Sequence, residues 1–504
     1  MLDATLQAAW AGLDLVLTWP NILYPVAGTL LAMTVAFLPG ISGVTLMALA
    51  VPFTLFWEPL PVVLLFGGLV GGATFMGSVT AILFNVPGTG PSAATLLDGH
   101  PLAQQGHAKT AIGCAAMASA MGSSFGVLVL VALIPLMHHA IRAFGPPELL
   151  MLLLWGLTTI ALVSRGSVSR ALAATGIGLL LAFVGQDPRT GEPRFTLGTL
   201  YLWDGLGLVP VMLGLFSIAE MIDLGRSGRH TISGHTRVEE LAGSVRDGAM
   251  AVFRHFGLFI RSAAIGTFVG IVPGVGGTVA SFLAYGHAVG TARDRDRFGK
   301  GDIRGVLAPE AAHDAKDGGA LVPVLAFGIP GSDATAVLLA VLLLHGIVPG
   351  RELMTDQLPL VFVLVWALFL SNWLTSLLGL LLVTPLARLT TVPLQRLAPI
   401  GIALAAAGAF VDQQRFGDVG VAVVFGVLGY YMKKHAWPRI ALVVALLLGG
   451  GIERHLQITT ALYGLGRLDL LARPLLLLLA ALALLNLTLP RLRAARRASK
   501  RSAD

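Results

Sequence analysis

The sequence predicts an all-α polytopic membrane protein that contains two inverted-topology repeats, with re-entrant hairpins and discontinuous helices. Composition is the first observation: hydrophobic residues make up 55% of the 504, charged residues 12%, and the mean hydropathy is +0.81. Globular chains usually carry about 25% charged residues. The other two observations are long uncharged runs and a repeated order of Pro-Gly motifs.

Uncharged runs recur along almost the whole chain. The first extends from Leu15 to Trp57. The others are 59–97, 110–141, 149–164, 171–186, 205–219, 334–350, 357–387, 397–411, 419–432 and 474–490. About 20 apolar residues span a bilayer, and a helix satisfies its backbone polar groups internally. The runs therefore predict a bundle of membrane-spanning and part-spanning helices in contact with lipid.

The basic residues divide the chain into four parts. Residues 1–141 contain one Lys or Arg, residues 222–304 contain eleven, and the tail RLRAARRASKR contains six. Positive clusters beside apolar segments mark cytoplasmic loops, so we do not assign the net charge of +7 to nucleic-acid binding. We predict a first transmembrane repeat (1–221), a cytoplasmic linker (222–262), a second repeat (263–490) and a cytoplasmic tail (491–504).

Two pairs of Pro-Gly motifs define the repeat. PGISG begins at Pro39 and is followed by FNVPG, whose proline is Pro87; PGVGG begins at Pro273 and is followed by FGIPG, whose proline is Pro330. The spacings are 48 and 57 residues, and both pairs enclose an apolar segment. Two matches in one order indicate a duplicated architecture.

The flanks of the two PGxxG motifs suggest opposite orientations. Basic residues bracket the second motif on both sides, and about thirty residues separate the two clusters. At 1.5 Å per residue this length allows two short legs and not two full crossings. This length therefore predicts a re-entrant hairpin, which enters and leaves the membrane on the same side. The flanks of the first motif, residues 1–20 and 57–61, carry no Lys or Arg and are expected to face outward.

The broken helices predict a binding site for an anion. Proline interrupts a helix and suits the first turn of the next, while glycine permits close approach. Amides at a new helix start favour a carboxylate, and unwound carbonyls favour Na⁺. Polar side chains such as Ser42 and Thr278 follow the breaks. A Na⁺ site is predicted near Ser78, Asn85, Asp314 and Ser332. The alternative is that the breaks only permit tight packing.

Three other signals have simpler interpretations. GGLVGG at 67–72 predicts a close helix-packing face. Glu310, Asp314 and Asp317 either couple cations at membrane depth or lie at the interface. The single cysteine, Cys114, excludes an intramolecular disulfide. No HExxH, G-x-S-x-G or Walker A sequence occurs. The chain is therefore not expected to be an enzyme, to need a cofactor or to hydrolyse ATP.

The chain resembles the large membrane subunit of the tripartite tricarboxylate transporters, the TctA family, from about residue 20 to 460. The resemblance is carried by the segments NVPGTGPSAATLLDGHPLAQQGHA, GQDPRTGEPRFTLG and FGKGDIRGVLAPEAAHDAKDGGALVPVLAFGIPGSDATAVLLAVLLLHGIVPG. The binding motifs carry over to Pro39, Gly40, Gly43, Asn85, Pro87, Gly88, Pro273, Gly274, Gly276, Gly277, Pro330, Gly331 and Ser332. The family commonly has two asparagines where this chain has His313 and Asp314, and often has Gly at Ser42.

The resemblance implies a secondary transporter in a bacterial inner membrane. Its expected partners are a small four-helix membrane subunit and a periplasmic solute-binding protein, which delivers a carboxylate. Uptake would be coupled to Na⁺ or H⁺. A receptor-independent carrier, an exporter, a channel and a membrane-embedded enzyme are the alternatives. The oligomeric state, including a homo-oligomer, and the identity of the carboxylate stay open.

Overall fold

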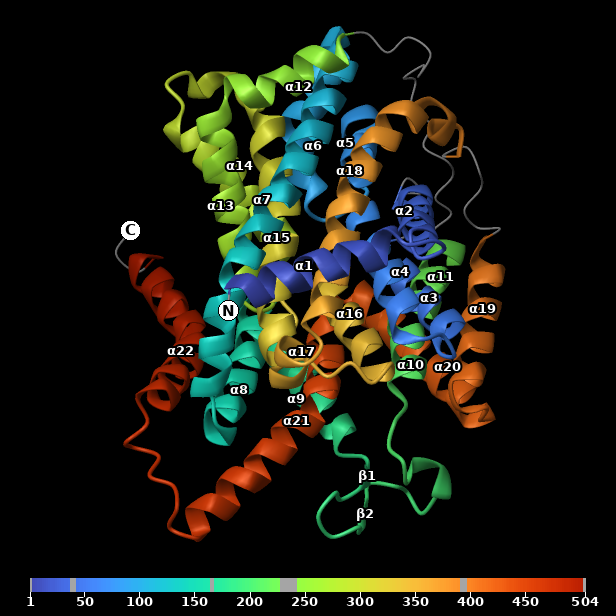
Figure 1. Ribbon diagram of the computed structural model, residues 1–504, viewed down its shortest axis with the longest axis vertical. Coiled ribbons are helices and arrows are strands. Elements are labelled where there is room, and N and C mark those ends of the chain that lie inside the picture. Colours follow the sequence, from blue (N-terminus) through green and yellow to red (C-terminus); the bar gives the residue numbers. More distant parts are fainter. Residues whose placement is uncertain (1, 37–41, 164–166, 227–242, 390–396, 502–504) are drawn as a thin grey trace.

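The computed structural model describes residues 2–36, 42–163, 167–226, 243–389 and 397–501. Figure 1 shows an almost entirely helical molecule, which confirms the all-α prediction. Six helical spans in the described ranges are long and apolar enough to cross a membrane, and eight apolar helices are shorter. The protein is therefore a multi-pass membrane protein. The inverted relation of the repeats and the bounds of the four predicted segments stay predictions.

The helices of the first predicted repeat are α1 (Leu2–Leu17), α2 (Leu23–Ala36), α3 (Gly43–Thr54), α4 (Pro59–Gly72), α5 (Thr74–Phe84), α6 (Ser92–Leu102), α7 (Ala108–Ala143), α8 (Pro146–Val163), α9 (Val168–Ala182), α10 (Leu208–Met212) and α11 (Ala219–Arg226). Two short π-helices, η1 (Ala103–His107) and η3 (Leu213–Ile218), and one 3₁₀ turn, η2 (Leu200–Leu202), lie between them. Two short strands, β1 (Gly185–Gln186) and β2 (Pro193–Arg194), pair antiparallel.

The helices that follow are α12 (Val245–Arg254), α13 (Phe256–Ile271), α14 (Gly276–Thr291), α15 (Arg304–Phe327), α16 (Asp333–Leu344), α17 (Arg351–Thr355), α18 (Leu358–Leu389), α19 (Leu397–Gln413), α20 (Phe416–Lys434), α21 (Arg439–Gly464) and α22 (Pro474–Arg501), with a 3₁₀ turn, η5 (Arg295–Arg297). In Figure 1, α12 lies at one end of the molecule and the β1–β2 hairpin at the opposite end.

The α13–α14 hairpin has the short legs that the sequence predicts. Each helix has 16 residues, and the two pack against each other. At 1.5 Å per residue each leg is about 24 Å long, less than the roughly 30 Å of a hydrocarbon core. Residues 272–275, which include Pro273 and Gly274, connect the legs. The connection therefore lies where the PGVGG motif predicts the helix break.

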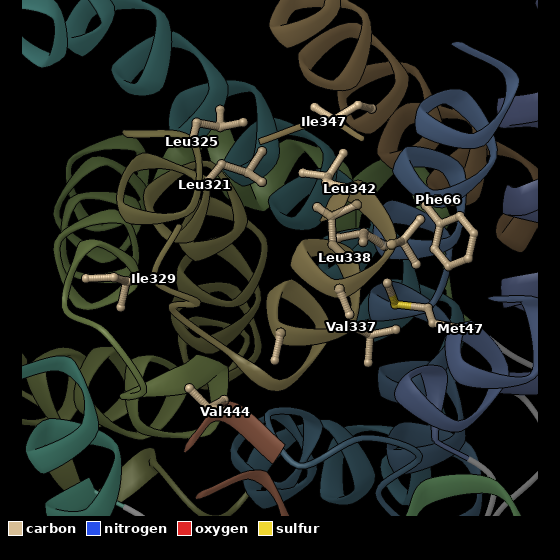
Figure 2. Close-up of a cluster of buried hydrophobic side chains, with 14 of the residues drawn as sticks. Met47, Phe66, Leu321, Leu325, Ile329, Val337, Leu338, Leu342, Ile347 and Val444 are labelled. Carbon is tan, nitrogen blue, oxygen red and sulfur yellow. The ribbon is translucent and has the colours of Figure 1, made fainter. Parts of the chain in front are cut away.

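The buried apolar side chains form two large cores. The first core joins α3, α4, α16 and α18, where Phe66, Met47 and Leu338 pack together (Figure 2). The second core joins α5 to α7 with α12 to α15. Helix α15 contributes to both, because its Val306–Ala315 part lies in the second core while its Leu321–Ala326 part lies in the first. The cores therefore do not coincide with the two predicted repeats, since each contains helices from both.

Glycine allows the central helices to pack backbone to backbone. A Cβ placed on Gly126 of α7 would lie 2.3 Å from the Ala315 carbonyl oxygen of α15. A Cβ on Gly266 of α13 would lie 2.2 Å from the Ala312 carbonyl oxygen. The GGLVGG prediction is also confirmed, since Gly68 of α4 has similarly close contact with the Pro25 backbone of α2. Small residues thus set the separation between helices in the interior.

Candidate functional site

The structure confirms helix breaks at the second, third and fourth Pro-Gly motifs. Helix α2 ends at Ala36 and α3 begins at Gly43. Pro39 and Gly40, between them, lie outside the described residues. Helix α5 ends at Phe84 and α15 ends at Phe327. The C-cap residue after each helix, Asn85 (φ 56°) and Gly328 (φ 66°), has the left-handed conformation. These equivalent ends, in the second and fourth motifs, support a shared local architecture.

A serine side chain caps the N-terminus of each of the helices α3 and α16. Ser42 accepts a hydrogen bond from the Thr45 amide, and Ser332 accepts one from the Thr335 amide. Thr335 also accepts a hydrogen bond from the Ser332 amide at 2.8 Å, which completes a capping box. These hydroxyls satisfy amides that a helix start otherwise leaves unpaired. Ser42 and Ser332 therefore stabilise the new helices locally.

The four breaks gather around one region. A Cβ on Gly88, in the second break, would lie 3.1 Å from the carbonyl oxygen of Ala36 at the first. A Cβ on Gly277, after the third break, would lie 2.9 Å from the Pro91 ring. The fourth break meets the third, because a Cβ on Gly331 would lie 2.8 Å from the Gly270 carbonyl oxygen.

The predicted site residues differ in their surroundings. Asn85 and Pro87 are exposed, whereas Pro330, Gly331 and Ser332 are buried. Gly274 is tightly enclosed, since a Cβ there would lie 2.2 Å from Ile160.

Other predicted residues leave more space. A Cβ on Gly276 would meet no atom within 4 Å. Thr278 and Pro273 flank the start of α14, which has no side-chain cap, and Gly43 packs on Ala73. The third break is therefore open at Gly276 and enclosed at Gly274.

A buried charged segment of α15 lies against these breaks. The segment consists of Glu310, His313, Asp314, Lys316 and Asp317, all of them buried. A Cβ on Gly277 would lie 2.8 Å from Lys316 Cε and 3.4 Å from His313 Cδ2. These acidic residues pack inside the helix bundle, and their depth in the membrane stays a prediction.

Hydroxyl groups from three helices hold the two carboxylates of this segment. Ser78 of α5 donates to Glu310 Oε1 at 2.6 Å, and Thr95 of α6 donates to the same oxygen. Ser119 of α7 donates to Asp314 Oδ2 at 2.5 Å. Lys316 pairs with the adjacent Asp317. Within the predicted Na⁺ set, Ser78 and Asp314 thus belong to one cluster, while Asn85 and Ser332 lie at helix ends.

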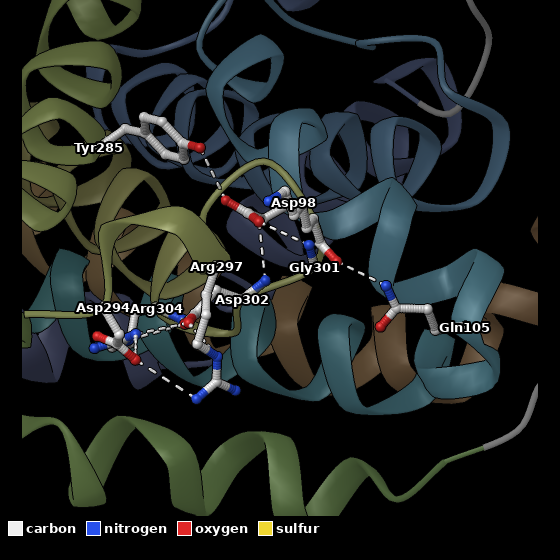
Figure 3. Close-up of polar contacts among 9 residues, drawn as sticks. Asp98, Gln105, Tyr285, Asp294, Arg297, Gly301, Asp302 and Arg304 are labelled. Carbon is white, nitrogen blue, oxygen red and sulfur yellow. Dashed lines mark hydrogen bonds and ion pairs between the residues drawn. The ribbon is translucent and has the colours of Figure 1, made fainter. Parts of the chain in front are cut away.

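A second polar network joins α6 to the loop before α15 (Figure 3). Asp98 Oδ1 accepts hydrogen bonds from the amides of Gly301 and Asp302, at 2.9 and 2.8 Å. Its other oxygen accepts one from the Tyr285 hydroxyl of α14 at 2.9 Å. In the same loop, the Arg304 guanidinium hydrogen-bonds Asp294 and lowers the pKa of that carboxyl below its usual value. The network fixes the start of α15 relative to α6 and α14.

Sequence reasoning missed several residues of the cluster. Thr95 and Ser119 lie 215 and 195 positions from their partners. His313 was noted only as a departure from the family, although Glu310, His313 and Asp314 have i, i+3, i+4 spacing, which places side chains on one helix face. This spacing is the feature of the sequence from which the cluster of Glu310, His313 and Asp314 could have been predicted.

Comparisons with known proteins agree with this architecture. The sequence profile of the tripartite tricarboxylate transporter TctA family matches residues 22–444. An uncharacterized 52.8 kDa protein in the TAR-I ttuC′ 3′ region of Agrobacterium vitis is 33% identical over 451 residues, which are 88% of each chain. A second Agrobacterium vitis protein, from the TAR-II ttuC′ 3′ region, is 31% identical over 196 residues, 38% of this chain and 79% of that protein. No solved structure matches. The chain therefore belongs to the tripartite tricarboxylate transporter TctA family.

Proposed function

We propose that this chain is the inner-membrane permease subunit of an ion-gradient-driven importer, and that it takes up a carboxylate delivered by a periplasmic solute-binding protein. Family membership supports the transporter class and the presence of partner subunits. The observation that carries the mechanism is the gathering of helix breaks around the buried charged segment of α15. Interrupted helices and ionisable groups inside a membrane bundle are typical of solute pathways.

The solute's carboxylate would bind at the junction of the second and third breaks. The start of α14 lacks a side-chain cap, and Gly277 lets this helix start approach Lys316 closely. Amides at a helix start carry partial positive charge and attract an anion. Backbone amides recognise carboxylates generally, so the periplasmic receptor would select among them. The small four-helix membrane subunit would complete the membrane complex.

The energy for uptake would come from a Na⁺ or H⁺ gradient. The sequence contains no Walker A motif, which a subunit that hydrolyses ATP would need. Coupling requires that the cation and the solute bind in one membrane-embedded unit that opens alternately to each side.

Reconstituted uptake tests the proposal. The chain and its small membrane subunit are placed in proteoliposomes, and the receptor is supplied outside with a panel of labelled mono-, di- and tricarboxylates. We expect accumulation of the receptor's ligand only when the receptor and an inward Na⁺ or H⁺ gradient are both present. Equal uptake without receptor would indicate a receptor-independent carrier. Flux that equilibrates without any gradient would indicate a channel, and either result would contradict the proposal.

A further inference from the structure

Three side chains with metal-binding atoms converge on one face of α15. Glu310, His313 and Asp314 each offer a ligand atom, and these atoms lie within 4.8 Å of one another. All three residues are buried. Their i, i+3, i+4 spacing brings them together without any distortion of the helix.

The hydrogen bonds leave one atom of each side chain without a partner. Glu310 Oε1 and Asp314 Oδ2 accept hydrogen bonds from hydroxyls, whereas Glu310 Oε2, Asp314 Oδ1 and His313 Nδ1 are buried and have no partner. Buried polar atoms in folded proteins normally have one. Hydroxyls that hold one oxygen of a carboxylate orient the other, as the outer shell of a metal site does.

The charged segment of α15 contains more acidic than basic side chains, so a bound cation would stabilise it. Glu310, Asp314 and Asp317 are acidic, and Lys316 is basic. Lys316 pairs with Asp317. In the described parts of the chain, no ion pair reaches Glu310 or Asp314, whose neighbours from α5, α6 and α7 include the hydroxyls of Ser78, Thr95 and Ser119. Two adjacent carboxylates inside a protein are unfavourable in the ionised form unless a positive charge compensates them.

The ligand set indicates which cation fits. Na⁺, Mg²⁺ and Ca²⁺ prefer oxygen ligands alone, whereas an imidazole nitrogen together with carboxylate oxygens suits divalent first-row metals. We propose that Glu310, His313 and Asp314 form a binding site for a divalent first-row metal ion such as Mn²⁺, Co²⁺ or Zn²⁺. Three protein ligands leave further coordination positions open. This proposal is independent of the proposed transport function, because the metal would bind to the protein in the absence of solute and of any ion gradient.

Cobalt binding to the purified full-length chain tests the site. The protein carries a tag without histidine, is stripped of metal with a chelator and is titrated with Co²⁺ in detergent. We expect one equivalent of Co²⁺ to bind with visible d–d absorption that Zn²⁺ abolishes by competition. His313→Gln, Glu310→Gln and Asp314→Asn are each expected to weaken Co²⁺ binding by about tenfold or more, in line with the dependence of metal affinity on its ligands.

The matched control is the double variant His138→Gln/His139→Gln, which removes two adjacent histidines near the end of α7. It should bind Co²⁺ as the parent chain does. A second measurement needs no variant: pulsed EPR of the Mn²⁺-loaded parent protein should show coupling to an imidazole nitrogen. Absence of saturable Co²⁺ binding overturns the proposal. So does an unchanged affinity in folded His313→Gln, or a Mn²⁺ signal without nitrogen coupling.

Discussion

Gly277, just after the third helix break, lies against the charged segment of α15. It is the second residue of α14, it is buried, and because it has no side chain Lys316 and Pro91 pack directly against its backbone. Its role is therefore close approach and not an unusual backbone conformation. Gly274 differs, because it combines φ 76° with close contact to Ile160, so a side chain there would be strained on both counts.

Gly277→Ala should lower carboxylate uptake by about tenfold, equivalent to roughly 1.4 kcal/mol. The added methyl group would press on the Lys316 stem at 2.8 Å and on the Pro91 ring at 2.9 Å, and so would push apart the helix start and the charged segment that form the proposed solute site. The measurement is receptor-dependent uptake in proteoliposomes, normalised to folded protein. Gly286→Ala is the control, because it lies in the same helix and a Cβ there meets nothing within 4 Å. Equal uptake by both variants would remove Gly277 from the solute path.

At the scale of elements, the α7–α15 crossing determines how the interior is packed. Gly122 and Gly126 of α7 face the backbone of Ala311 and Ala315. The contact lies beside the charged segment, so it also positions that segment.

Gly126→Ala should destabilise the protein by about 1–3 kcal/mol, the usual effect of overpacking a filled interior. The new Cβ would lie 2.3 Å from a backbone oxygen, which cannot move aside as the end of a side chain can. Thermal unfolding in detergent should show a lower midpoint. Gly176→Ala in α9, where a Cβ meets nothing within 4 Å, should leave the midpoint unchanged or raise it slightly, because alanine favours a helix more than glycine does. A drop shared by both variants would mean that the crossing is not the cause.

The Asp98 network joins α6, α14 and the start of α15, and its loss should be measurable. Asp98→Ala leaves the Gly301 and Asp302 amides without their acceptor, so we expect destabilisation by about 1–3 kcal/mol. Tyr285→Phe removes one hydrogen bond and should have a smaller effect, about 0.5–1.5 kcal/mol.

Hydrogen exchange measures this difference directly, because residues 299–304 should exchange faster in Asp98→Ala than in Tyr285→Phe. Asp296→Ala, an exposed position in the same loop, serves as the control. If Asp98→Ala exchanged no faster than this control, the carboxylate would not hold the loop.

For the whole molecule, the inverted arrangement of the repeats can be tested by labelling. Glu58 and Arg295 are exposed and lie in loops that the sequence assigns to opposite sides of the membrane. Glu58→Cys should react with an impermeant maleimide from the outside, and Arg295→Cys only in inside-out vesicles. The parent chain is a suitable background, since its one cysteine, Cys114, is buried. Labelling of both positions from the same side would contradict the inversion.

The sequence predicted local features better than long-range pairing. Proline and glycine act on the backbone nearby, so the ends of α5 and α15 and the start of α14 fell at the Pro-Gly motifs. The contacts of Ser119 with Asp314 and of Thr95 with Glu310 depend on how distant helices pack, which one sequence does not reveal. For the same reason, the two apolar cores were not foreseen from the repeat.

Close backbone packing around α15 has a consequence for the movement of the site. Helix α15 packs closely against glycines of α7 on one side and of α13 on the other. If α15 moved along its axis by one residue, its backbone carbonyl oxygens would face side chains of α7 and α13 in place of these glycines and would clash with them. The charged segment would therefore travel only as part of a three-helix block. Part of that block's outer surface is apolar, with Phe268 of α13 69% exposed. When this three-helix block moves, the lipid acyl chains around it must rearrange. The rate of solute transport should therefore vary with bilayer thickness and fluidity.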